Sequence, residues 1–187
     1  YLVITFTPKA DLFSPQTLKQ LEALRDELAM LDGLESITTI LDVPLISSPP
    51  VSLDDLQIEV PTLLSEGTDI ELARRELTGS SLYRQLLTSI DGKTTALLVT
   101  FRLDPDYVRL LAERDALREQ QLTAELTPAD KRRLAELSPV ISEYRAQLTW
   151  RQQEDIAGVR EILDRYRVYG DIQLGGIPMI VTDMLDF

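Results

Sequence analysis

The residue groups that could do chemistry in this chain are few, and each lacks a partner that the chemistry needs. Gly92-Lys93-Thr94 matches the end of a phosphate-binding loop, but the first glycine of that motif would stand at position 87, which is Leu. Gly175-Gly176 lacks the third glycine of a dinucleotide fingerprint and follows a predicted strand instead of opening a helix. Ser80-Ser81 has no histidine to act as its base. These patterns favour a turn at Gly92 and a backbone bend at Gly175-Gly176 over ligand sites.

Carboxylates are the remaining candidates for acid–base chemistry. Asp54-Asp55 and Glu154-Asp155 are neighbours in sequence, and neighbouring side chains on a helix do not share a face. The 187-residue chain contains neither His nor Cys, which removes the commonest general base, the commonest zinc ligands and all thiolate chemistry. We therefore predict no catalytic residue, no metal site and no cofactor. Enzymatic carboxylate chemistry is the third hypothesis, behind the two developed below.

The composition disfavours several classes of partner. The chain has 19 Lys and Arg residues against 31 Asp and Glu residues, so its formal net charge is −12. An acidic surface repels phosphate, which argues against nucleic acid and anionic lipid headgroups as partners. Hydrophobic residues make up 44% of the chain, enough for a packed core, yet no run of about 18 apolar residues could span a membrane.

Hydrophobic patterning predicts four strands. Each candidate is a short run rich in β-branched or aromatic residues, and the third is almost continuously apolar, as expected of a central strand. Asp91-Gly92 predicts a hairpin turn between Leu86–Ile90 and the third strand. The predicted strands lie near residues 1–7, 36–43, 94–103 and 168–175.

Cap residues mark the predicted helices. Ser14-Pro15 opens a helix in which leucines recur at three- and four-residue intervals. Thr68 and Glu71 have the spacing of a capping box and predict a short second helix. Further starts, which predict a long helical hairpin with its tip near 127–139, are Asp104-Pro105, Thr127-Pro128 and Ser138-Pro139.

The order of these elements predicts the fold. Strand, helix, strand, connector, strand, long helical segment and strand make an α+β protein with the ferredoxin-like βαββαβ pattern. We expect an antiparallel four-stranded sheet with two helices on one face and the first and third strands in its centre. The chain is one domain, 1–187, made of a core (1–44, 84–105 and 166–178), a connector (45–83) and a helical hairpin insertion (106–165).

The two ends of the chain are apolar. The sequence opens in a predicted strand at Tyr1 without an initiating Met, and its last segment, from Gly175 to Phe187, is mostly apolar. We expect a domain cut from a longer protein, with one membrane helix just before Tyr1 and another shortly after Phe187.

Several segments, in this order and spacing, resemble one family. They are Pro8–Ser14, Leu18–Leu31, Gly33–Ile37, Leu87–Ala96 and Leu174–Ile180. The whole chain resembles the extracytoplasmic loop domain of resistance-nodulation-division (RND) exporters, in the MMPL branch. The resemblance departs from the family in its long insertion, and it includes no docking domain for an outer-membrane channel.

The resemblance implies a non-enzymatic porter-type domain on the periplasmic side of a bacterial inner membrane exporter. Such a domain would gate or guide an apolar or lipid-like substrate, while the proton-carrying carboxylates lie in membrane helices outside this chain. The implied partners are the rest of the same membrane protein, including a second repeat loop, and a homo-oligomer is left open. Membrane helices flanking this segment in the parent protein would support the exporter hypothesis.

Five residues are candidates for functional positions. Gly175, Gly176 and Pro178 would form a hinge or linker near the membrane. Tyr144 and Trp150 lie on the predicted hairpin, where core packing is the default and a partner or substrate surface is the functional alternative. The second hypothesis for the chain as a whole is therefore a non-catalytic protein–protein interaction module that uses this hairpin.

Overall fold

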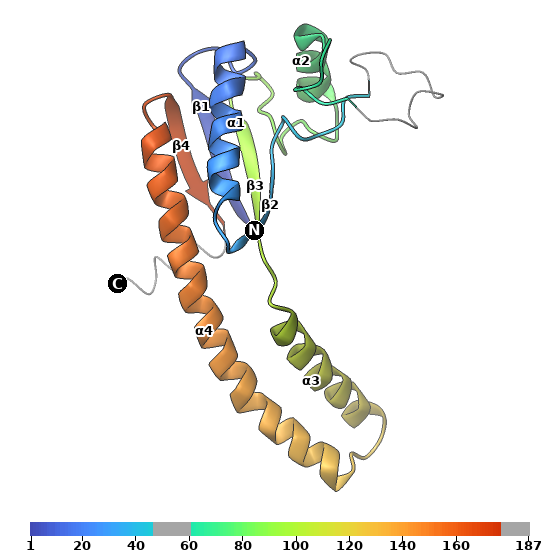
Figure 1. Ribbon diagram of the computed structural model, residues 1–187. Helices are drawn as coiled ribbons and strands as arrows, with labels where there is room; N and C mark the ends of the chain where they lie inside the picture. Colours follow the sequence, from blue (N-terminus) through green and yellow to red (C-terminus); the bar gives the residue numbers. More distant parts are fainter. Residues whose placement is uncertain (47–60, 177–187) are drawn as a thin grey trace. The chain divides into compact units, whose positions relative to one another are not determined.

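The computed structural model describes residues 1–46 and 61–176 (Figure 1). The described part is an α+β fold with a four-stranded antiparallel sheet and four helices. The chain divides into two compact units, which we call unit 1 (the described residues within Tyr1–Phe101 and Ile156–Phe187) and unit 2 (Arg102–Asp155).

Unit 1 contains the sheet. Its strands follow the order β2-β3-β1-β4, and every neighbouring pair is antiparallel. The expectation that the first and third strands are central is confirmed. The strands are β1 (Leu2–Pro8), β2 (Leu34–Thr38), β3 (Thr95–Phe101) and β4 (Gly170–Gly175).

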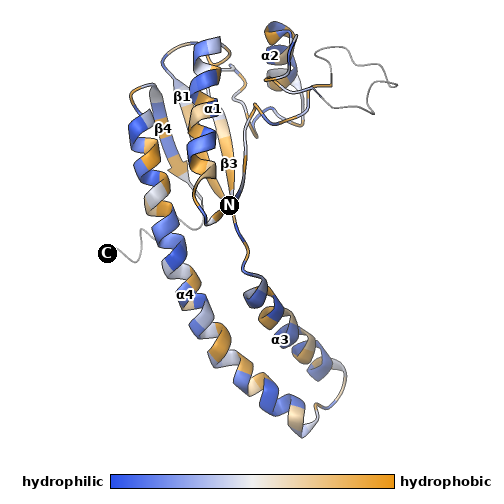
Figure 2. Cartoon of the chain, in the orientation of Figure 1, coloured by the Kyte–Doolittle hydropathy of each residue, from blue (hydrophilic) through white to orange (hydrophobic). Residues whose placement is uncertain are grey.

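Buried and half-buried side chains alternate along the central strands, which indicates that one face of the sheet is buried. Leu2, Ile4 and Phe6 of β1 are fully buried, whereas the residues between them are only half-buried. Ile4 pairs with Leu97, and Phe6 pairs with Ile172, so the buried side chains of three strands lie on one face. Figure 2 shows the apolar character of β1 and β3.

Two helices cover that buried face. α1 (Pro15–Ala29) begins at the predicted cap, where the Ser14 hydroxyl accepts a hydrogen bond from the Thr17 N–H. The last part of α4 (Pro128–Tyr166) lies beside α1, and Gly158 there leaves room for the side chain of Leu31. Both helices bury an apolar stripe in the core shared with the sheet, made of Leu18, Leu21, Leu24 and Leu28 on α1 and of Ile156, Val159, Ile162, Leu163 and Tyr166 on α4.

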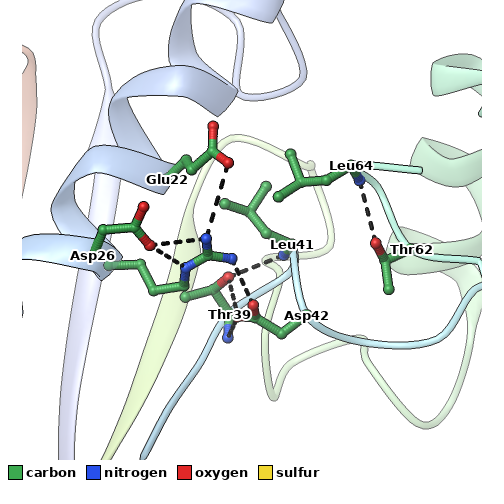
Figure 3. A network of polar contacts seen from close by, with 8 residues as sticks. Glu22, Asp26, Thr39, Leu41, Asp42, Thr62 and Leu64 are labelled. Atoms are coloured by element: carbon green, nitrogen blue, oxygen red, sulfur yellow. Dashed lines mark hydrogen bonds and ion pairs between the residues drawn. The ribbon is translucent and has the colours of Figure 1, made fainter. Parts of the chain in front are cut away.

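The second strand is shorter than predicted, because a turn replaces its second half. The Asp42 carboxylate accepts hydrogen bonds from the N–H and the hydroxyl of Thr39, at 2.9 and 2.7 Å (Figure 3). The hydroxyl of Thr39 in turn accepts one from the N–H of Leu41. The Arg25 guanidinium of α1 donates a hydrogen bond of 2.6 Å to the same Asp42 carboxylate. Local side-chain bonds of this kind compete with a strand ladder, so β2 ends at Thr38.

Two other local predictions need correction. α2 (Ile70–Gly79) is capped by Asp69, whose carboxylate accepts from the N–H groups of Glu71 and Leu72, and not by Thr68. The arm Leu86–Ile90 forms turns and isolated bridges, not a strand. The predicted turn at Gly92 is present, with a φ of 66° that favours glycine.

Unit 2 consists of α3 (Pro105–Thr123) and the first part of α4. Asp104 caps α3 as predicted, accepting from the N–H groups of Asp106 and Tyr107. The predicted helix start at Ser138-Pro139 is wrong, because α4 runs through Pro139. Leu137 and Ile141, one on each side of this proline, are both buried. Their burial favours a continuous helix although the proline removes one backbone hydrogen bond.

The boundary between the units lies inside α4. The sequence predicts an insertion over residues 106–165, whereas residues 156–165 lie in unit 1. The connector 45–83 likewise contributes Ala73 and Leu77 of α2 to the core of unit 1. Among the helices that the structure describes, none combines the length and the apolar character needed to cross a membrane.

Candidate functional site

A candidate site among the described residues of unit 1 is a groove between α1 and the end of α4, which we call the α1–α4 groove. It holds about 410 Å³ and is open to solvent. Its volume is in the range of small-molecule pockets, roughly 300–1,000 Å³. Its walls are formed by Gln16, Lys19, Gln20, Ala23 and Glu27 of α1 and by Arg165, Tyr166 and Tyr169.

Three polar side chains that line the groove are joined by hydrogen bonds between its two helices. The hydroxyl of Tyr166 donates a hydrogen bond of 2.7 Å to one carboxylate oxygen of Glu27, and Arg165 donates one of 2.5 Å to the other. Tyr166 is buried, and its ring meets that of Tyr169 edge-on at a centroid distance of 5.9 Å. The Tyr166 hydroxyl and then Arg165 lower the pKa of the Glu27 carboxyl. The Glu27 carboxylate is therefore held in place as a hydrogen-bond acceptor and is not a free acid or base.

The buried phenol of Tyr166 should make the stability of unit 1 depend on pH in the alkaline range. Burial, and then the hydrogen bond to Glu27, raise the pKa of its phenol from 10.0 to about 12. The unfolded chain therefore loses this proton first, so the stabilisation is complete below pH 10 and disappears between pH 10 and about 12. The loss should be on the order of 2 kcal/mol.

Urea unfolding at pH 9 and pH 11.5 measures this loss. Tyr166→Phe should have a smaller alkaline decline than the unchanged chain, whereas Tyr169→Phe should keep it. Equal declines in all three proteins would show that Tyr166 does not titrate as its position implies.

The glycine pair after the last strand has a definite geometry. Gly175 is the last residue of β4 and pairs with Val3 of β1. Gly176 has a φ of 136°, and a Cβ built on it would lie 2.8 Å from the carbonyl oxygen of Tyr1. Only glycine suits this close approach. Pro178 lies outside the described residues, and the hinge role of all three remains a prediction.

Tyr144 and Trp150 have different environments, although they are close on α4. Tyr144 stacks on Tyr107 of α3 at a centroid distance of 6.0 Å, and its hydroxyl donates to the Asp104 carboxylate at 3.2 Å. Desolvation, and then the charge of Asp104, raise the pKa of the Tyr144 phenol. Trp150 is 71% exposed, so core packing does not explain it. Of the two, Trp150 is the one available to a partner of unit 2.

The other candidate groups from the sequence are used in local structure. The hydroxyl of Ser89 accepts from the N–H groups of Lys93 and Thr94, which closes the turn at Gly92. The Lys93 ammonium lies 3.9 Å from the Asp91 carboxylate. The hydroxyl of Ser80 accepts from the N–H of Leu82 in another turn. Asp54-Asp55 lies outside the described residues.

Across residues 1–46 and 61–176, no three acidic side chains gather closely enough to hold a metal ion. No family model, curated protein or solved structure matches this chain. The functional argument therefore rests on the residues themselves.

The α1–α4 groove has no sufficient signal in local sequence. Glu27 and Tyr166 are 139 residues apart in the chain, so no local motif joins them. One signal was available, because the leucine stripe of α1 leaves Ala23 and Glu27 on its outer side. That pattern alone does not indicate which helix packs beside them.

Proposed function

We propose that this chain is the extracytoplasmic, porter-type domain of a proton-driven exporter of the RND/MMPL kind. In this proposal the sheet is the ferredoxin-like βαββαβ core and unit 2 is a helical hairpin inserted between its third and fourth strands. The domain sits on the periplasmic side of a bacterial inner membrane. It has no catalytic role and guides an apolar or lipid-like substrate.

The observation that carries this proposal is the pairing of the first and last strands. Val3 pairs with Gly175 in an antiparallel register, so β1 starts beside the point where β4 ends. A domain inserted into the loop between two membrane helices needs its entry and exit at the same end of the sheet. Gly176 is also close to Tyr1, since a Cβ built on it would lie 2.8 Å from the Tyr1 carbonyl oxygen. The segment resemblance given above supports the same assignment.

The amino-acid composition is consistent with a transport role that needs no catalytic residues in this domain. The chain has no His and no Cys, and the carboxylates that carry protons in such exporters would lie in membrane helices. Rigid-body movement of this domain against a second repeat loop would open and close a path for the substrate. The sheet and its helices would move as one body because they share a single core.

Labelling of the full-length gene product tests the location. The chain has no Cys, so Ala129→Cys on exposed α4 introduces a single thiol into this domain. In cells with a permeabilised outer membrane, a membrane-impermeant maleimide should label this thiol while the inner membrane is intact. The parent protein, with its own cysteines replaced, is the control. Labelling only after the inner membrane is broken, or recovery of the protein in the soluble fraction, would refute the proposal.

Cellular accumulation of a lipophilic fluorescent dye tests the transport role. Cells that express the full-length protein should retain less dye than cells that express a variant lacking residues 1–176. Dissipating the proton gradient should abolish the difference. Equal retention in the presence of correctly inserted protein would contradict transport of apolar compounds.

A second candidate function is a non-catalytic interaction module that uses α3 and α4. The observation in its favour is the exposed indole of Trp150, since an exposed tryptophan is a common anchor of protein interfaces. This alternative gains support if the labelled protein is soluble and Trp150→Ala releases a bound protein.

A further inference from the structure

The outward side of α1 has a regular pattern that the core of unit 1 does not use. Its solvent-facing positions recur every three or four residues and are exposed at Gln16, Lys19, Ala23, Asp26 and Met30. The smallest of them, Ala23, is in the middle. A small residue at the centre of an exposed helical stripe lets a second helix approach closely. Met30 is 81% exposed at the end of the stripe.

The charges on this stripe are reversed about Ala23. Lys19 stands four residues before Ala23, and its side chain has no hydrogen bond or ion pair with the residues that the structure describes. Glu27 stands four residues after Ala23, next to Asp26. Glu27 already binds Tyr166 and Arg165, but a carboxylate has lone pairs for further donors.

This pattern is complementary to itself in one orientation only. If a second α1 lies antiparallel across the first at Ala23, each Lys19 lies over the Asp26 and Glu27 of the other copy. A parallel arrangement would instead place Lys19 against Lys19 and Glu27 against Glu27. Two-fold symmetric dimers use the same surface on both subunits, so each favourable contact occurs twice.

In the antiparallel orientation Met30, the apolar residue at the end of the stripe, also lies against a suitable surface of the other copy. Met30 stands seven residues after Ala23, and Gln16 stands seven residues before it. Gln16 and the partly exposed ring of Tyr169 both line the α1–α4 groove. The thioether of Met30 from a second copy would therefore lie at the mouth of the groove, against an aromatic ring, which is a favourable contact.

We propose that α1 and the α1–α4 groove form a self-association surface, on which a second copy of this chain docks its own α1 antiparallel about Ala23. α1 has 15 residues, about 22 Å at 1.5 Å per residue. One helix face of this length buries less than the roughly 1,200 Å² of a stable interface, so the dimer is weak and depends on protein concentration. This proposal does not depend on the exporter assignment.

Cysteine cross-linking of the full 187-residue chain tests the geometry, because the chain has no native Cys. Ala23→Cys places two thiols together on the two-fold axis, whereas Ala29→Cys lies on the same helix, is also exposed and stands about a third of a turn away from Ala23 around the helix axis. Under mild copper-catalysed oxidation, Ala23→Cys should form a disulfide-linked dimer at least about tenfold faster than Ala29→Cys, because docking raises the effective thiol concentration. Equal rates for the two variants would overturn the proposal.

A charge reversal tests the pairing of Lys19 with the acidic end. In the Ala23→Cys background, Lys19→Glu should slow cross-linking by about tenfold, because two attractive contacts become repulsive. Lys93→Glu makes the same charge change at another exposed lysine and should leave the rate unchanged. Both side chains are exposed, so melting temperatures should match and exclude a folding defect. If Lys19→Glu and Lys93→Glu have the same rate, the proposed antiparallel contact is wrong.

Discussion

Gly170→Ala is expected to lower the free energy of unfolding of unit 1 by roughly 3 kcal/mol, the upper part of the usual range for overpacking. A Cβ built on Gly170 would lie 2.4 Å from the carbonyl oxygen of Thr7 and 2.8 Å from the Cα of Pro8. It would also lie 2.6 Å from the ring of Phe6. Two of these three neighbours are backbone atoms of the central strand. The chain can therefore relieve the clash only by separating β4 from β1.

Gly79→Ala is the matched control for this substitution. Gly79 ends α2, and a Cβ built on it meets no atom within 4 Å. Its replacement should leave stability unchanged or raise it by up to about 1 kcal/mol, because alanine restricts the unfolded chain. Urea unfolding followed by far-ultraviolet circular dichroism measures both variants. Similar values for Gly170→Ala and Gly79→Ala would mean that β1 and β4 are not in the close register described here.

The strands were predictable where one face is buried and the other is not. In β1 the alternation of Leu2, Ile4 and Phe6 with smaller or polar residues reflects burial on one side only. The same alternation misled the analysis after Thr38, where Thr39 and Asp42 continue the pattern by chance. Their side chains bind backbone and each other in a turn. An alternation of apolar and polar residues indicates which side chains are buried, and a turn can show the same alternation over a few residues.

The helical part shows a second limit of prediction from sequence. Proline is a strong signal for a helix start, and Pro15, Pro105 and Pro128 are all at such starts. Pro139 has the same local sequence signal, because Ser138 precedes it. There the helix continues, since Leu137 and Ile141 are buried on either side. Packing of this kind depends on residues that are distant in the chain, which local sequence does not reveal.

The candidate site was beyond prediction for a related reason. The sequence indicates Tyr144 and Trp150, which share a helix, as candidates for a surface. In the structure Tyr144 packs on Tyr107 and Trp150 is exposed, while Tyr166 of the same helix binds Glu27. Helical spacing gives the relative direction of side chains on one helix. It does not say which direction faces solvent or which faces the distant segment that completes a site.

Val159→Asp should be the most damaging of the substitutions considered, and Trp150→Asp should be nearly neutral, although both change α4. Val159 is fully buried in the core that α4 shares with the sheet and α1. A carboxylate there would be buried in a hydrophobic core, so we expect a loss of about 4 kcal/mol, a sizeable part of the stability of a small domain. Trp150 is 71% exposed, and its replacement should change stability by about 0.5 kcal/mol or less.

Comparing Val159→Asp with Trp150→Asp tests where unit 1 ends along α4. Amide hydrogen exchange of β1 and β3 measures the effect directly, because these strands are the centre of the sheet. Val159→Asp should abolish most of their protection, and Trp150→Asp should preserve it. If Val159→Asp left the strands protected, the last part of α4 would belong to the insertion, as the sequence analysis assigned it. If Trp150→Asp removed protection as well, the indole would be part of the core, and its use as an anchor for a partner would lose its basis.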